Sequence, residues 1–365
     1  MANQQMKNVE QLDPNMKLKG PDDKEWRWIS PLQPPVQVTG FSWLSEEKIY
    51  RRLPQNPRWP LPPAVDSLAN CTAGGQIRFA TNSRRLSLRV ELAAPASMYH
   101  MPATGQCGFD CYIGAPGGQR YFSTTRYDHK QSEYEAVLFE SNDSGLKNIT
   151  LNFPLYQGVK EVWIGVEADA AIEAPPAYED AGRVVVYGTS ITQGGCASRP
   201  GMAFTNILSR RINREFINLG FSGNGKGEPE LAHIIGEIPD VACYVLDYDA
   251  NVASVEAMQE TLPEFIRILR NDHPQTPILV ISRVPAANEF YQEEALKNRL
   301  GKLNVQRETV ARLQSDGDRN ITFLNGEELM GEEYLESTVD GSHPTDLGFW
   351  LMANALEPVL KNLLP

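Results

Sequence analysis

The chain has 365 residues, which is more than one typical domain contains and favours two domains. Its formal net charge of −12 argues against nucleic acid or an anionic membrane as a partner. No run approaches the roughly 20 apolar residues that span a bilayer, and residues 1–7 lack the apolar core of a signal peptide. We therefore expect a protein that spans no membrane. We expect a cytoplasmic protein if the sequence is as written, or a periplasmic or secreted one if a signal peptide has been removed.

The cysteine pattern bears on metal binding. An odd number of cysteines without metal-type pairing favours free thiols, here Cys71, Cys107, Cys111, Cys196 and Cys243. Cys107 and Cys111 have the spacing of a metal-binding pair, but no second pair or histidine cluster accompanies them. We therefore expect neither a metal site nor a cofactor.

The first half of the chain has no helical periodicity. Residues 1–65 are rich in proline and tryptophan, which is typical of an extended segment that packs on the next domain. From 66 to 175 the apolar residues alternate with period two, which predicts strands at 76–80, 86–92, 108–113, 134–139, 149–153 and 162–166. Short strands separated by turn signals predict an all-β, jelly-roll-like sandwich domain.

The pattern changes after a proline-containing linker at 174–177. Helical patterns, including 202–211, 255–271 and 293–315, now alternate with predicted strands at 183–187, 215–219, 241–246, 277–281 and 321–324. This alternation predicts a second domain over 180–365 with a parallel sheet between two layers of helices.

The first strand of this second domain leads directly to a serine. Residues 183–195 read RVVVYGTSITQGG, in which a β-branched strand ends at a glycine and the pair Thr189-Ser190 follows. A strand, a tight turn and a helix expose a nucleophile at the C-terminal edge of a parallel sheet. The alternative is an ordinary turn in which Ser190 caps a helix.

A second group of chemically active residues lies near the C-terminus. Residues 339–345 read VDGSHPT, so Asp340 and His343 share one short loop after the last strand. His343 is then placed to take the proton of Ser190, while Asp340 holds the imidazole and stabilises its charged form. For His343 alone a structural role is the alternative, and a Ser190–His343 dyad without Asp340 also stays open.

At these positions the chain resembles the SGNH/GDSL hydrolase family. The Gly-Asp-Ser of the family's first block is Gly-Thr-Ser at 188–190, and the Asp-x-x-His of its last block is found at 340–343. The resemblance extends over about 180–365. It implies a flavodoxin-like, three-layer α/β/α fold and an esterase that needs no cofactor.

The same resemblance implies an oxyanion hole made by three donors. They are the N–H of Ser190, the N–H of the second-block Gly223 in LGFSGN, and the amide of the third-block Asn251 in LDYDANV. The third block lacks the family's glycine and second acidic residue. Each such donor lowers the barrier by about 3 to 4 kcal/mol. The alternatives are a turn glycine at 223 and a helix cap at 251.

The first domain also resembles a known module. Residues 108–112 read GFDCY, similar to the Gly-x-Asp-Leu-Tyr motif of a small sandwich domain that precedes some bacterial SGNH esterases. A similar layout occurs in carbohydrate acetylesterases and implies that the sandwich helps to build the substrate cleft. Asp110 and Tyr112 are therefore candidates for substrate binding, with a place at the domain interface as the alternative. For His100 and His129, which lie in predicted loops of the sandwich, the sequence names no partner.

These residues together predict a serine esterase. The expected substrate is a small-molecule or oligosaccharide ester, with an acetyl group on a sugar or xylan-like chain as the first choice. The alternatives are a lipase or thioesterase for longer acyl chains, and an inactive carbohydrate-binding protein. The sequence does not predict the oligomeric state.

Overall fold

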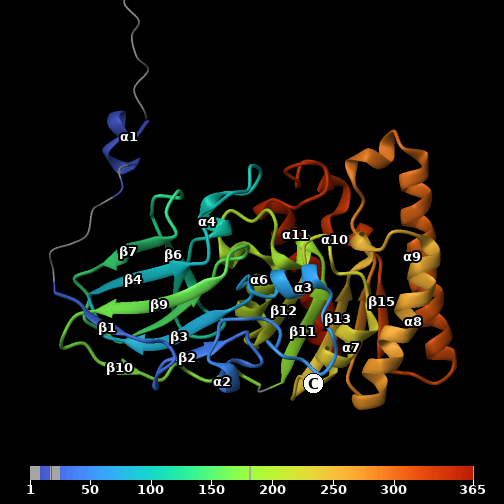
Figure 1. Ribbon diagram of the computed structural model, residues 1–365, viewed down its shortest axis with the longest axis horizontal. Helices are drawn as coiled ribbons and strands as arrows, with labels where there is room; N and C mark the ends of the chain where they lie inside the picture. Colours follow the sequence, from blue (N-terminus) through green and yellow to red (C-terminus); the bar gives the residue numbers. More distant parts are fainter. Residues whose placement is uncertain (1–8, 17, 19–24, 181, 365) are drawn as a thin grey trace, which may run out of the picture.

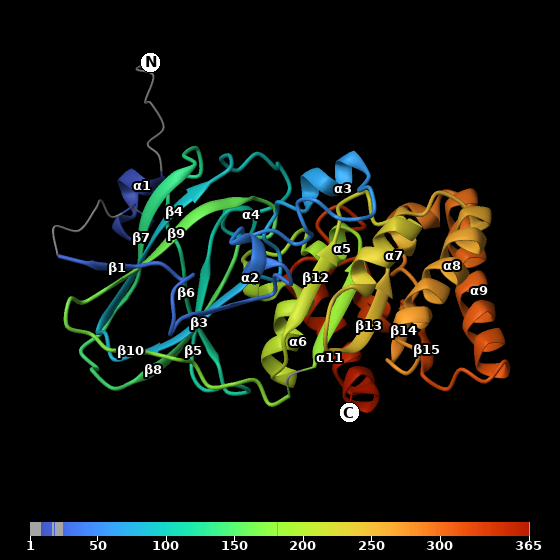
Figure 2. The same cartoon turned by 60° about the horizontal axis from the view of Figure 1, so that its bottom comes forward.

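The computed structural model describes residues 9–16, 18, 25–180 and 182–364. Residues 1–7, for which we expect no signal-peptide core, lie outside these ranges, as does part of the proline- and tryptophan-rich segment 1–65. A β-rich N-terminal part and an α/β C-terminal part lie side by side (Figures 1 and 2). Within the described ranges, no helix is long and apolar enough to cross a lipid bilayer.

The N-terminal part consists of antiparallel sheets packed against each other. One sheet has the order β1-β9-β4-β7, made of Arg27–Ile29, Val159–Val166, Arg85–Leu92 and Glu133–Glu140. The other has the order β10-β3-β8-β5-β6, made of Ile172–Glu173, Gln76–Thr81, Lys147–Asn152, Asp110–Ile113 and Arg120–Thr124, with β2 (Gln37–Thr39) paired to β3. Alternate residues of both sheets, such as Leu88, Ile77 and Leu151, meet in one apolar core.

The six strands predicted between 76 and 166 are confirmed, with ends that differ by up to three residues. The strands β1, β2, β6 and β10 were not predicted. They have two to five residues, and runs this short carry little of the period-two signal. Because β1 pairs with β9 and β2 with β3, the segment before residue 65 contributes strands to both sheets.

The C-terminal part contains a parallel sheet with the order β12-β11-β13-β14-β15. The strands are Phe216–Gly220, Arg183–Gly188, Val241–Asp247, Ile278–Ile281 and Ile321–Leu324, so the predicted strands of this part are confirmed. This is the flavodoxin-like order, in which ligands bind outside the carboxyl ends of the strands.

Helices cover both faces of the parallel sheet (Figure 1). One face packs against α3 (Pro63–Leu68), α7 (Pro229–Gly236), α8 (Val255–Asp272) and α9 (Glu293–Ser315). The other packs against α6 (Phe204–Ile212), α10 (Glu327–Met330) and α11 (Asp346–Leu363). Further short helical segments are α1 (Val9–Leu12), α2 (Leu44–Glu47), α4 (Ala103–Gln106), α5 (Ser190–Gln193), and the 3₁₀ turns η1 (Pro14–Met16), η2 (Pro200–Met202), η3 (Asp249–Asn251), η4 (Ala287–Phe290) and η5 (Gly331–Tyr334).

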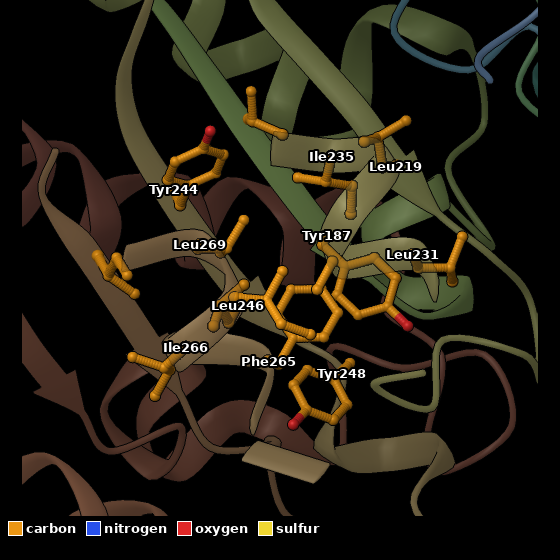
Figure 3. Close-up of a cluster of buried hydrophobic side chains, with 14 of the residues drawn as sticks. Tyr187, Leu219, Leu231, Ile235, Tyr244, Leu246, Tyr248, Phe265, Ile266 and Leu269 are labelled. Carbon is orange, nitrogen blue, oxygen red and sulfur yellow. The ribbon is translucent and has the colours of Figure 1, made fainter. Parts of the chain in front are cut away.

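Aromatic packing fixes the strand that leads to Ser190. Tyr187, near the end of β11, stacks on Phe265 of α8 with ring centroids 4.9 Å apart, and Tyr248 packs beside both rings (Figure 3). The buried Tyr187 hydroxyl donates to Glu228 Oε2 at 3.1 Å. The end of β11 is therefore held by its own side chain three residues before Ser190.

Candidate active site

Ser190 lies on the turn between β11 and α5. The Thr189 side chain caps α5 by accepting a hydrogen bond from the backbone N–H of Ile191 at 3.3 Å. Gly188 leaves no room for a side chain, because an added Cβ would lie 2.0 Å from Thr192 Oγ1. Only 8% of Ser190 is exposed, so the turn holds its hydroxyl in a nearly dry position.

Asp340 and His343 lie in a loop that folds back on itself before α11. Asp340 Oδ1 accepts the backbone N–H groups of Ser342 and His343 at 3.0 and 2.8 Å, and Oδ2 lies 2.7 Å from His343 Nδ1. Burial alone would raise the pKa of Asp340, but the hydrogen bonds from His343 and Ser342 outweigh it and leave the pKa below its usual value. Asp340 is therefore ionised at neutral pH and can hold a proton on His343 Nδ1.

The structure brings Ser190, His343 and Asp340 into one chain of hydrogen bonds. Ser190 Oγ lies 2.9 Å from His343 Nε2, across 153 residues of sequence. With Nδ1 paired to Asp340, Nε2 is the nitrogen that is free to accept the serine proton. The geometry is suited to proton removal from Ser190 as its oxygen attacks an electrophile.

The loops after β12 and β13 bring hydrogen-bond donors to the same edge. Gly223 has a φ of +69°, and an added Cβ would meet no atom within 4 Å, so this side of its turn is open. Asn251 Oδ1 accepts the N–H of Gly225 at 3.3 Å, which ties η3 to the Gly223 turn. Among the described residues, the N–H groups of Ser190 and Gly223 and the Nδ2 of Asn251 have no acceptor in the protein.

Asp247, at the end of β13, is a residue that the sequence analysis did not single out. Thr192, two residues after Ser190, donates its hydroxyl to Asp247 Oδ2 at 2.8 Å. Burial raises the pKa of Asp247 to about 7; the nearby Asp249 adds to the rise and the Thr192 hydrogen bond opposes it. A carboxyl group that titrates near neutrality therefore contacts the Ser190 turn. Its position at the carboxyl end of the third strand was the available signal.

The sandwich contacts the same turn through its loops. Tyr156, between β8 and β9, donates its hydroxyl to the backbone oxygen of Ser190 at 3.1 Å. His100, in the loop before α4, lies edge-on to His343 with ring centroids 5.7 Å apart. The partner of His100, which could not be named from the sequence, comes from the other half of the chain. His129 is exposed on the sandwich surface.

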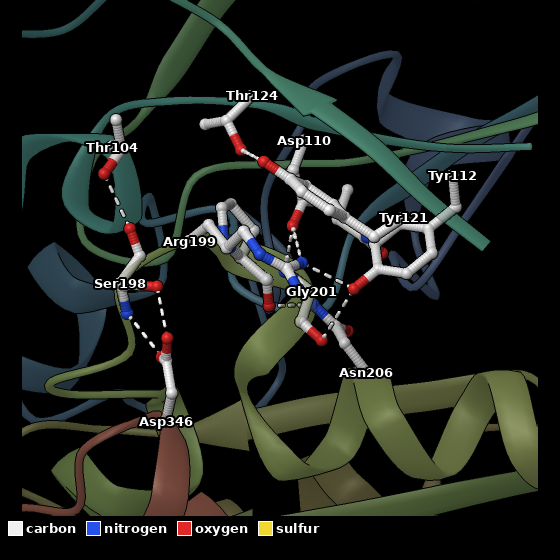
Figure 4. A network of polar contacts seen from close by, with 12 residues as sticks. Thr104, Asp110, Tyr112, Tyr121, Thr124, Ser198, Arg199, Gly201, Asn206 and Asp346 are labelled. Atoms are coloured by element: carbon white, nitrogen blue, oxygen red, sulfur yellow. Dashed lines mark hydrogen bonds and ion pairs between the residues drawn. The ribbon is translucent and has the colours of Figure 1, made fainter. Parts of the chain in front are cut away.

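Asp110 and Tyr112 lie at the interface between the sandwich and the α/β part (Figure 4). The fully buried Asp110 carboxylate accepts hydrogen bonds from Asn152 Nδ2, Arg199 Nη1 and the N–H of Gly201 at 2.7, 2.9 and 2.7 Å. Tyr112 also accepts from Arg199 Nη1, at 2.5 Å. These contacts engage Asp110 with the loop that follows α5, and the structure brings neither residue into hydrogen-bond contact with the Ser190–His343–Asp340 chain.

The groups that could bind a metal are unsuited to it or already engaged. Cys107 and Cys111 are free and buried, and burial raises the pKa of Cys107 to about 12 and that of Cys111 further, which disfavours the thiolate that a metal needs. His100, Asp340 and His343 offer ligand atoms within 4.8 Å of one another. Two of these three residues already bond to each other, so a metal there would compete with the hydrogen-bond chain.

Comparisons with known proteins cover both parts of the chain. Residues 181–361 match the GDSL-like lipase/acylhydrolase family, and residues 26–172 match the N-terminal domain of SGNH-hydrolase-type esterases. A structure described as a GDSL-like lipase from Bacteroides ovatus has 30% sequence identity and a TM-score of 0.85, with 93% of this chain and 98% of that chain covered. None of the curated protein sequences matches significantly.

More distant structures share the fold. A salicylyl-acyltransferase from a tetracycline biosynthetic pathway has 20% identity and a TM-score of 0.76, and a family two carbohydrate esterase from Cellvibrio japonicus has 14% identity and a TM-score of 0.60. Each alignment covers 93% of this chain and 98% of the other. The extent of the 30% match and the two adjoining family matches lead to one conclusion: this chain belongs to the GDSL-like lipase/acylhydrolase family and carries the N-terminal domain of SGNH-type esterases.

Proposed function

We propose that this protein is a serine esterase that hydrolyses short acyl esters, above all acetyl esters of a carbohydrate. The observation that carries the proposal is the hydrogen-bond chain from Ser190 Oγ through His343 to Asp340, with distances of 2.9 and 2.7 Å. These hydrogen bonds lie at the carboxyl edge of the parallel sheet, next to unpaired N–H donors. Acyl transfer needs this arrangement.

In the acylation step, Ser190 Oγ attacks the ester carbonyl carbon while its proton passes to His343 Nε2. The carbonyl oxygen becomes an oxyanion, and the N–H groups of Ser190 and Gly223 and the Asn251 amide donate hydrogen bonds to it. The positive imidazolium is stabilised by the Asp340 carboxylate. When the tetrahedral intermediate collapses, the ester C–O bond breaks and His343 gives its proton to the departing alcohol.

In the deacylation step, water takes the place of the alcohol. His343 accepts a proton from water as the water oxygen attacks the acyl-Ser190 carbonyl, and the same donors hold the second oxyanion. Collapse releases the carboxylic acid and returns the proton to Ser190. The cycle closes without a redox partner or an activated co-substrate.

The preference for acetyl groups on carbohydrate rests on analogy. The fold is shared with a family two carbohydrate esterase, and the family match includes the sandwich domain that adjoins the site. Fold-level similarity favours this hypothesis over the longer-chain alternatives. Acyl length is therefore the first property to measure.

The decisive test compares hydrolysis of p-nitrophenyl acetate, butyrate and octanoate by the native protein, Ser190→Ala and the matched exposed-site variant Ser315→Ala. We expect acetate to be the best substrate and Ser190→Ala to lower kcat by about 10⁴- to 10⁶-fold, with Ser315→Ala unchanged. A preference for octanoate would favour a lipase or thioesterase. A folded native protein without turnover would contradict the esterase and favour an inactive carbohydrate-binding protein.

A further inference from the structure

Two tyrosines are exposed to an unusual degree. Tyr99 is 94% exposed and Tyr291 is 96% exposed, the highest values among the large apolar and aromatic side chains in the described part of the chain. An aromatic ring that packs against so little of its own protein gains almost nothing from the hydrophobic effect. Both tyrosines lie in loops that contact the segment carrying Asp340 and His343.

Tyr99 approaches this segment from the sandwich. Its ring stacks on that of His100 with centroids 4.5 Å apart, and the His100 ring lies 5.7 Å from that of His343. The buried Nδ1 of His100 has no hydrogen-bond partner among the described residues. A polar atom left unpaired beside the reacting histidine is unusual for a purely structural contact. The ring of His100 thus contacts both the ring of Tyr99 and the ring of His343.

Tyr291 approaches from the α/β part. It follows η4 in the connection after β14, so it starts from the same carboxyl edge as Ser190. The N–H of Ala287 donates to the backbone oxygen of Gly341, between Asp340 and His343, at 2.8 Å. Tyr291 follows Ala287 by four residues, and each 3₁₀ residue advances about 2 Å, so its backbone lies roughly 8 Å along η4 from the residue that contacts Gly341.

The three segments involved gather along one side of the molecule. In Figure 1 the teal loop before α4, the red loop before α11 and the orange connection before α9 all lie along the upper edge. The contacts of His100 with His343 and of Ala287 with Gly341 show that the loop before α11 touches both of the other segments. The rings of His343 and His100 connect Ser190 to Tyr99, so we take the alcohol portion of the ester, rather than its acetyl group, as the part that contacts the tyrosines.

We propose that Tyr99 and Tyr291 are stacking platforms for sugar rings, and that the esterase acts on acylated, uncharged oligosaccharides rather than on single sugars. This inference rests on the proposed esterase function and adds the class and size of its substrate. Tyrosine offers an apolar face to the C–H side of a sugar and a hydroxyl to its polar edge. The net charge of −12 disfavours an anionic sugar chain.

The test compares acetylated xylotetraose, acetylated xylose and p-nitrophenyl acetate as substrates of the native protein, Tyr99→Ala, Tyr291→Ala and the double variant. We expect the double variant to lower kcat/KM for acetylated xylotetraose by about 10-fold or more, mainly through KM, because two ring contacts are lost. Hydrolysis of p-nitrophenyl acetate should change less than about 2-fold, since its single small ring can engage at most one platform. Trp163→Ala, which removes a 37% exposed ring of β9, is the matched control and should leave all three substrates unchanged.

Three outcomes overturn the proposal: equal losses on all substrates, no loss on the tetraose ester, or a change of oligomeric state in the tyrosine variants by size-exclusion chromatography with light scattering. Calorimetric binding of unacetylated xylotetraose to the native protein and to the double variant separates this proposal from the esterase itself. Binding that the double variant loses would uphold the platforms even if no ester were hydrolysed. Ester hydrolysis without tetraose binding would uphold only the esterase.

Discussion

The two parts of the protein contribute to the candidate site in different ways. The α/β part supplies Ser190, His343 and Asp340 from loops at the carboxyl edge of one sheet. The sandwich supplies Tyr156 and His100, which reach the same site only because the two parts pack together. The first contribution follows from strand order. The second depends on an interface that strand order does not determine.

That interface is held by buried polar contacts as well as by apolar packing. Arg52, in the N-terminal segment, is fully buried and donates to the backbone oxygens of Leu68, Cys71 and Gly220, the last residue of β12. Burial lowers the pKa of Arg52 to about 10, so it is still a cation at neutral pH. Because a buried charge is costly unless it is fully hydrogen-bonded, such contacts fix the relative position of the two parts more strictly than apolar packing alone.

After the loss expected for Ser190→Ala, the largest effect is expected at Asp340, which also belongs to the α/β contribution. Asp340→Asn retains the shape of the side chain but removes the charge that holds the proton on His343 Nδ1. We expect kcat for p-nitrophenyl acetate to fall by about 10² to 10⁴-fold with KM little changed. Glu336→Gln, an exposed carboxylate in the preceding segment, is the control. A loss below tenfold would favour a Ser190–His343 dyad.

The corresponding change in the sandwich acts on stability. Asp110→Asn replaces a carboxylate oxygen by an amide donor that faces groups which are themselves donors, including Arg199 Nη1 at 2.9 Å. Breaking a buried ion pair costs about 3 to 5 kcal/mol, which urea denaturation can measure. Glu135→Gln, which breaks the exposed pair with Arg89 in the same sandwich, should cost at most about 1 kcal/mol. Equal costs for the two variants would contradict a structural role for Asp110.

The same contrast explains what the sequence predicts and what it does not. The alternation of strands with helices and the period-two strands predict both halves of the fold, because each pattern is local. Ser190, Asp340 and His343 could be predicted as a group, since each lies in a short loop next to a predicted strand or helix. The contact between His100 and His343 joins loops more than 200 residues apart, and no local pattern encodes it. The burial of Asp247 likewise depends on how β13 and α5 pack.

Asp247 provides the next test, through the pH dependence of folding. Its folded-state pKa of about 7 lies above the ordinary value of 3.8, so the unfolded chain ionises first as the pH rises. The stabilising contribution is complete below about pH 4 and is lost by about pH 7, a change of about 4 kcal/mol for a shift of this size. Asp247→Asn should remove this component. The free energy of unfolding of the variant, relative to that of the native protein, should therefore be higher at pH 8 than at pH 4.

The measurement is the free energy of unfolding in urea at several pH values. Asp316→Asn, an exposed aspartate at the end of α9, should give a pH profile parallel to that of the native protein. If Asp247→Asn also gives a parallel profile, the buried carboxyl group does not couple pH to folding. Native-like activity of Asp247→Asn at pH 8 would further show that the Ser190 turn tolerates an uncharged partner for Thr192.

The smallest effect is expected at the contact between the sandwich and the Ser190 turn. Tyr156→Phe removes the hydrogen bond to the Ser190 carbonyl oxygen, but the N–H groups of Gly194 and Gly195 still donate to that oxygen at 3.0 and 2.9 Å. One hydrogen bond of this kind is worth about 1 kcal/mol, which corresponds to a loss of about fivefold in kcat/KM if it orients the turn.

Tyr134→Phe is the matched control, because Tyr134 donates to the backbone oxygen of Cys107 at 3.1 Å inside the sandwich. Both variants lose a buried tyrosine-to-carbonyl hydrogen bond and should lose similar stability in urea. Only Tyr156→Phe should lower kcat/KM for p-nitrophenyl acetate. Equal activity in the two variants would mean that the sandwich supports the fold of the turn without orienting Ser190, and its contribution to the site would then be limited to the loop that carries Tyr99 and His100.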